Sequence, residues 1–131
     1  MSKREKYIET KVHLKASAQQ FYDVFCNRPH HIANILPKKY NEKKYVAKEV
    51  VEGINKENCK LSFKVLEGDL LGLYKSFKTD FQVTPKGNGS VVQWTLVFEK
   101  QENHIPDPHT LLQLVVEMSK NIDSYLTQEN N

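Results

Sequence analysis

The chain is poor in the residues and segments that mark specialised protein classes. Among its 131 residues only Cys26 and Cys59 are cysteines, and their separation gives neither a CxxC redox spacing nor the repeated spacing of a zinc site. In a reducing compartment both are expected to be free thiols. A chain of this length can bury most of the surface that its unfolded form exposes, so it should fold without a disulfide or a metal.

Long apolar runs are absent as well. Residues 1–7 are polar and lack the apolar core of a secretory signal, and no segment has the roughly 20 apolar residues that a membrane-spanning helix needs. We therefore expect a cytoplasmic protein without membrane insertion. The sequon that begins at Asn88 should then go unglycosylated.

A strong excess of one charge is also missing. Nineteen Lys and Arg residues against 16 Asp and Glu residues give a net charge of +3, which favours solubility and says little about partners. The only local cluster is Lys38, Lys39, Lys43 and Lys44. It contains no arginine, so a solvated loop is favoured over a surface for a phosphate backbone. We expect no nucleic-acid partner.

Alternating apolar and polar residues are what the sequence does contain. This pattern is typical of strands with one wet face, and it occurs in residues 7–14, 61–66, 77–83 and 92–98. The Val-rich residues 45–54 are predicted to form a further strand. Turns are predicted at residues 55–58, 67–69 and 85–89, the last with two glycines where a positive φ is expected. Consecutive strands with short turns predict an antiparallel sheet.

Two short helices are predicted near the N-terminus. Ser17 and Gln20 have the spacing of a capping box, and apolar residues follow at helical spacing until near Cys26. Pro29 is predicted to open a second short helix that Pro37 ends.

A long C-terminal helix should begin with Asp107 as its N-cap and Pro108 as its first residue, and should reach about Leu126. In residues 111–118 its apolar stripe is wider than the roughly 100° arc of a helix with one wet face. Either this half is buried nearly all round, or part of it lines a cavity. The elements together predict one α+β domain over residues 1–131, in which a bent sheet grips the long helix.

Five segments are similar to a known family in their order and spacing: residues 15–26, 28–32, 47–69, 74–94 and 105–112. They resemble the major latex proteins, a branch of the superfamily named for the major birch pollen allergen, Bet v I. The resemblance implies a helix-grip fold, in which an antiparallel sheet wraps a long terminal helix and two short helices close the base of an apolar pocket. It also implies a ligand-binding role in plant defence or stress, with no established reaction.

One part of the family pattern is missing. Members typically have two further strands, joined by a glycine-rich loop, before the strand equivalent to residues 45–54. Here only a few lysine-rich residues separate Pro37 from Tyr45, so this hairpin is expected to be absent or reduced to a stub. Of the remaining strands, residues 7–14 should lie beside residues 90–98, and residues 45–54 should become a sheet edge. Phosphate contact or ribonuclease activity of the glycine-rich loop is therefore not expected.

Few residues have the potential for catalysis or metal binding. His30 and His31 would point about 100° apart on a helix and could not readily share a metal. His104 and His109 are expected at the surface. The inward faces of the predicted strands are apolar, with Thr79 as their main polar member, which suits an apolar ligand rather than acid–base catalysis. We expect neither a cofactor nor a match to the Lys, Tyr and carboxylate set of lyase-type relatives.

The candidate ligand-binding residues are those expected to face the space between sheet and helices. They are Phe25, Ile32, Leu61, Phe63, Val65, Phe77, Thr79, Phe81, Trp94, Leu96, Phe98, Leu111, Leu114, Val115 and Met118. Aromatic residues on strands are more often plain core than ligand contacts, but the resemblance strengthens the ligand interpretation. Of the fifteen candidates, Phe63, Trp94 and Met118 are expected to approach one another.

Three hypotheses stay open. The first is a binding protein for a small hydrophobic ligand, such as a lipid, sterol, hormone-like or phenolic compound. The second is an enzyme acting on a small aromatic substrate in the same pocket. The third is an interaction protein whose shortened domain no longer holds a ligand. In each case a monomer or weak homodimer is expected, because charged residues can blunt the predicted edge.

Overall fold

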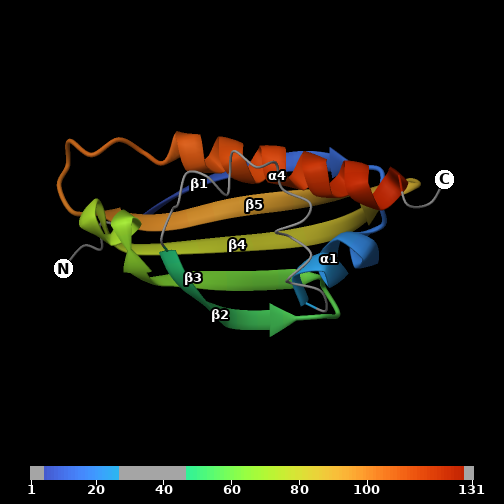
Figure 1. The fold of residues 1–131 in the computed structure, drawn as a ribbon, viewed down its shortest axis with the longest axis horizontal. Helices are drawn as coiled ribbons and strands as arrows, with labels where there is room; N and C mark the ends of the chain where they lie inside the picture. The colour runs from blue at the N-terminus through green and yellow to red at the C-terminus, as the bar shows by residue number, and fades with distance from the viewer. Residues whose placement is uncertain (1–4, 27–46, 129–131) are drawn as a thin grey trace.

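The structure is a computed structural model that describes residues 5–26 and 47–128. Five antiparallel strands form one sheet, and the long helix α4 (His109–Gln128) runs along it near β5 and β1 (Figure 1). The short helix α1 (Ala18–Cys26) packs at one end. The predicted second short helix, the lysine-rich loop and the predicted hairpin loss lie outside the described residues, as do Ile32, His30 and His31.

The strands lie in the order β1-β5-β4-β3-β2. Their bounds are Glu5–Leu14 for β1, Ala47–Asn55 for β2, Lys60–Gly68 for β3, Tyr74–Lys86 for β4 and Gly89–Lys100 for β5. The predictions that β1 lies beside β5 and that β2 is an edge of the described sheet are therefore confirmed. The opposite edge is β1 itself, which the sequence reasoning did not anticipate.

The connection between β3 and β4 differs from the prediction. The turn expected at residues 67–69 comes later, because β3 continues through Gly68. The chain then reverses in a short 3-10 helix, η2 (Asp69–Gly72). The apolar residues that follow the predicted turn thus lie largely in η2, and β4 begins at Tyr74.

Alternation in the sequence becomes alternation of burial in the sheet. In β5, the side chains of Val92, Trp94, Leu96 and Phe98 are at most 1% exposed, and the residues between them are half-buried. In β4, Phe77, Phe81 and Val83 are buried on one face, Thr79 on that face is half-buried, and a register shift precedes Ser76. Fully burying one such apolar side chain stabilises the fold by roughly 1.5–3 kcal/mol relative to exposing it. The predicted inward faces of these two strands are confirmed.

Two glycines shape the β4–β5 hairpin for different reasons. Gly87 has a φ of 59°, as the turn was predicted to require. Gly89 is needed for close approach, since a Cβ atom there would collide with the carbonyl oxygen of Leu14. A further positive φ, 52° at Cys59 in the β2–β3 turn, was not expected from the sequence.

The capping box of α1 is confirmed. The amide of Gln20 donates to the Ser17 hydroxyl at 3.1 Å, and the amide of Ser17 donates to the Gln20 side-chain carbonyl at 3.0 Å. Both bonds satisfy amide groups that a helix N-terminus otherwise leaves unpaired. The helix ends at Cys26, as predicted.

Helix α4 begins one residue later than predicted. The carbonyl of Pro108 accepts a hydrogen bond from the amide of Leu112 at 3.1 Å, so Pro108 occupies the N-cap position in place of Asp107. The carboxylate of Asp107 is instead 2.7 Å from the ammonium of Lys100, the last residue of β5. This contact lowers the pKa of Asp107.

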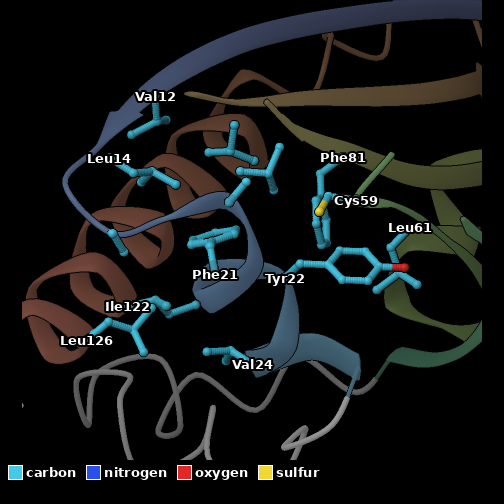
Figure 2. Close-up of a cluster of buried hydrophobic side chains, with 14 of the residues drawn as sticks. Val12, Leu14, Phe21, Tyr22, Val24, Cys59, Leu61, Phe81, Ile122 and Leu126 are labelled. Carbon is cyan, nitrogen blue, oxygen red and sulfur yellow. The ribbon is translucent and has the colours of Figure 1, made fainter. Parts of the chain in front are cut away.

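The second half of α4 is fixed to the rest of the fold. The carboxylate of Asp123 accepts hydrogen bonds from the amides of Lys15 and Ala16 at 2.9 and 2.8 Å. Ile122 and Leu126 are buried in the cluster that contains Phe21 of α1 (Figure 2). This half of the helix is therefore held by both polar and apolar contacts.

Candidate ligand-binding site

The inner face of the sheet forms the floor of the candidate site. Six of the predicted site residues lie there and are each at most 3% exposed: Leu61, Phe77, Phe81, Trp94, Leu96 and Phe98. The register places Phe81 of β4 between Leu61 of β3 and Trp94 of β5. Leu61, Phe81 and Trp94 belong to one buried cluster, and Phe77, Leu96 and Phe98 belong to a second.

Phe25 of α1 joins the outlying aromatic residues to this floor. Its ring centroid lies 4.8 Å from that of Phe81, 6.0 Å from that of Trp94 and 6.4 Å from that of Phe63. These distances are typical of interacting aromatic pairs. Because β4 separates β3 from β5, Phe63 and Trp94 meet through Phe25 and Phe81. Phe63 and Met118 both pack against the buried cluster that contains Trp94. A direct approach of Met118 to Phe63 and Trp94 stays a prediction.

The first half of α4 forms the opposite wall and is incompletely covered. All of its apolar side chains are half-buried: Leu111, Leu112, Leu114, Val115, Val116 and Met118. Further along the same helix, Ser119 and Ile122 are 0% exposed. Of the two alternatives for this stripe, burial nearly all round is therefore wrong. A band of apolar surface remains accessible on the half of α4 that precedes its anchored end.

A buried hydrogen-bond pair joins the floor to this helix. The indole Nε1 of Trp94 donates to the hydroxyl of Ser119 at 2.7 Å, and that hydroxyl donates to the carbonyl of Val115 at 2.7 Å. Ser119 was missed in the sequence, although a small polar residue in an apolar stripe was a signal. A buried indole usually needs an acceptor, and Ser119 supplies it.

Polar groups are sparse across the rest of the site. Thr79 is half-buried on the inner face, in register between Phe63 and Leu96. At the far end, the Tyr74 hydroxyl donates to the carbonyl of Pro106 at 2.9 Å. Burial, with the nearby Asp107 carboxylate, raises the pKa of Tyr74 above its usual value. Tyr74 therefore stays protonated and is poorly suited to act as a base.

Two further candidates are only partly placed by the structure. Val65 belongs to β3, but its side chain lies outside the described part, and Ile32 lies outside it altogether.

His104 and His109 are exposed, as expected. Within residues 5–26 and 47–128, no three metal-ligating side chains are grouped, and no helix is long and apolar enough to cross a membrane.

Comparison with known proteins gives this fold a family. The sequence profile of the "Pathogenesis-related protein Bet v 1 family" matches residues 39–129. The chain belongs to this family. It is 38% identical to MLP-like protein 43 of Arabidopsis thaliana, over 93% of both chains. It is also 37% identical to MLP-like protein 34 of the same plant. That match covers 93% of this chain but only 46% of the length of MLP-like protein 34.

Solved structures of the Bet v 1 fold agree. Ginseng major latex-like protein 151 from Panax ginseng matches with a TM-score of 0.83 at 22% identity, covering 94% of this chain and 98% of that one. Norcoclaurine synthase from Thalictrum flavum, solved with dopamine and hydroxybenzaldehyde, matches with a TM-score of 0.77 at 16% identity, covering 95% and 87%. At these identities the two likenesses establish the fold alone.

Proposed function

We propose that this Bet v 1 family protein binds a small hydrophobic plant compound between the first half of α4 and the inner face of the sheet. Proteins of the family generally bind ligands of this kind. The observation that carries the proposal is the row of half-buried apolar side chains on α4, opposite a fully buried floor. Apolar surface that the protein leaves accessible can be covered by an apolar ligand, and its removal from water favours binding.

The composition of the site favours a lipid, sterol, hormone-like or phenolic compound. Its walls are aliphatic and aromatic, and Thr79 is the inner-face polar side chain available to orient a ligand hydroxyl or carbonyl. Apolar walls distinguish ligands that differ by one methylene by only about 1–3 kcal/mol. The proposed site therefore accepts a class of compounds, consistent with a carrier in plant defence or stress responses.

Binding without turnover is favoured over catalysis. Norcoclaurine synthase has the same fold, but fold alone does not carry an activity. The hydroxyls of the buried residues Ser90, Ser119, Tyr22 and Tyr74 are already engaged in hydrogen bonds. Ser119 bonds Trp94 and Val115, and Ser90 donates to the carbonyl of Ala16 at 2.9 Å. The hydrogen bonds of these two serines join them to Trp94, Val115 and Ala16 rather than to a histidine or carboxylate that could activate a nucleophile.

A substitution that fills the proposed space tests this assignment. Val115→Trp adds a large ring to the half-buried face of α4, and Gln113→Trp adds the same ring to an exposed position of the same helix. Binding is measured by titration with a fluorescent fatty acid, with dehydroergosterol as a sterol and with quercetin as a phenolic compound. Urea denaturation of each variant reports its stability.

If the space is open, Val115→Trp should weaken the binding of a probe at least tenfold, with little change in the urea midpoint. Gln113→Trp should change neither quantity. In a filled core, the same ring would destabilise the fold by about 1–3 kcal/mol through overpacking. Such a loss of stability, together with no binding of any probe to the unmodified protein, would favour the interaction-protein hypothesis instead.

A further inference from the structure

Strand β1 ends the described sheet on the side away from β2. It pairs with β5 along one side only among the strands that the structure describes, and in Figure 1 it runs partly behind α4. Its inward residues Val12 and Leu14 belong to the buried cluster. Its outward residues are exposed from Glu5 to Lys15. An edge strand of this length can pair with a strand of another chain through its backbone.

Charge is segregated along the outward face of β1. The acidic residues Glu5 and Glu9 occupy its first half, and Lys11, His13 and Lys15 follow in its second half. Within residues 5–26 and 47–128, no Glu or Lys residue of this row forms an ion pair with another side chain. The Glu9 carboxylate accepts a hydrogen bond from the side-chain amide of Gln93 at 3.2 Å and keeps its charge. Two antiparallel copies of such a strand would bring the acidic half of each against the basic half of the other.

One register satisfies this complementarity. With Thr10 of the two copies opposite each other, Glu9 lies opposite Lys11 of the partner subunit, and residues 6–14 of both copies pair. Glu5 then lies beside Lys15 of the partner subunit. Two neighbouring registers keep the same faces together. In one of them Glu9 lies opposite Glu9 of the partner subunit. In the other, Lys11 lies opposite Lys11 of the partner subunit. Like charges directly opposite each other destabilise strand pairing.

The same register places an exposed ring over a hollow. Tyr7 is 66% exposed, more than any other large hydrophobic residue of the described chain. It would lie opposite His13 of the partner subunit. On that part of the outer face, a hollow of about 320 Å³ is lined by Lys11, His13, Thr84, Pro85, Lys86, Val91 and Gln93. The apolar edges of Pro85 and Val91 can contact the ring, and its hydroxyl stays near solvent.

We propose that two copies of this chain associate by antiparallel pairing of their β1 strands about a two-fold axis at Thr10. Each copy inserts Tyr7 into the hollow beside His13 of the other, and the two five-stranded sheets become continuous. The backbone hydrogen bonds contribute affinity, and the charge pattern sets the register. Because exposed ion pairs are weak and screened by salt, the dimer should be weak and should dissociate as salt is added.

Charge reversal on the full-length protein tests the pairing. Glu9→Lys and Lys11→Glu each turn two attractive contacts of the dimer into two repulsive ones. Glu57→Lys makes the same charge change as Glu9→Lys, in the exposed β2–β3 turn, and serves as its matched control. Sedimentation equilibrium in low-salt buffer gives the dissociation constant of each dimer. Circular dichroism verifies that each variant is folded.

Each single reversal should weaken the dimer about tenfold or more, whereas Glu57→Lys should leave it unchanged. An equimolar mixture of the Glu9→Lys and Lys11→Glu proteins should associate again, because the heterodimer restores both opposite-charge contacts. Tyr7→Ala should also weaken the dimer, and mixing this variant with another of the variants should not restore association. A protein that stays monomeric at millimolar concentration would overturn the proposal. So would a dimer that is unaffected by both reversals.

Discussion

The hydrogen bond between Trp94 and Ser119 should be an important source of stability, and Ser119→Ala measures it. The substitution leaves the indole N–H of a residue that is 1% exposed without its acceptor at 2.7 Å. An unsatisfied buried donor costs about 1–3 kcal/mol. The higher helix propensity of alanine offsets roughly 0.5 kcal/mol of this loss. The expected net destabilisation is therefore about 1–2 kcal/mol, or about 4–8 °C in Tm.

Urea denaturation of four proteins isolates the contribution of this bond. Ser119→Ala is compared in the unmodified protein and in a Trp94→Phe background, where the donor no longer exists. The cost of Ser119→Ala should fall to less than half in that background. Ser124→Ala, on the exposed face of the same helix, is the control and should cost no more than about 0.5 kcal/mol. An equal cost of Ser119→Ala in both backgrounds would refute the proposed coupling.

Three further perturbations follow from the described contacts. Gly89→Ala should prevent or severely weaken folding, because its Cβ would collide with the Leu14 carbonyl, whereas Gly87→Ala should cost only about 1–2 kcal/mol for its positive φ; chemical denaturation of both variants compares them. The contact with Lys100 lowers the pKa of Asp107. The contribution of this contact to the free energy of unfolding is therefore present above the ordinary pKa of 3.8 and is lost as pH falls through the lowered pKa. Asp107→Asn should therefore reduce the urea midpoint at pH 7 and leave it unchanged near pH 2, and equal reductions at both values would contradict this assignment. Alternating amides of β2 should exchange with deuterium faster than those of β4, and uniform protection of both strands in the monomer would show that another segment covers the β2 edge.

The two halves of α4 have different roles in this account. The second half is held against α1 by Ile122 and Leu126, and against the connection between β1 and α1 by Asp123. The first half keeps its apolar side chains half-buried over the sheet. Because the anchored half carries much of the packing, substitutions in residues 111–118 can alter a ligand site with a smaller effect on folding. This separation is what makes the comparison of Val115→Trp with Gln113→Trp informative.

Local patterns were sufficient to predict much of the fold. The two-residue periodicity identified the inward faces of β4 and β5, and the spacing of Ser17 and Gln20 identified the start of α1. Both signals depend on neighbours that are close in sequence, so a single sequence contains them. The resemblance to the major latex proteins supplied the pairing of β1 with β5, which the register confirms.

Features that depend on distant residues could not be predicted in the same way. The Ser119 contact requires α4 to cross β5 at Trp94, and the Asp107 contact requires β5 to end near the start of α4. No short-range pattern encodes either distance. Ligand occupancy of the fifteen predicted site residues stays a prediction, because an apolar side chain looks the same in sequence whether it touches protein or ligand.

The most direct test of the central claim is native mass spectrometry of the protein after expression in plant leaf tissue and gentle purification. We expect a population that carries one noncovalent adduct with the mass of a lipid, sterol or phenolic compound. This adduct should be strongly reduced in Val115→Trp and retained in Gln113→Trp. Only ligand-free protein in all three samples, with no binding of the fatty acid, sterol or phenolic probe afterwards, would contradict the assignment of this site as a ligand-binding site.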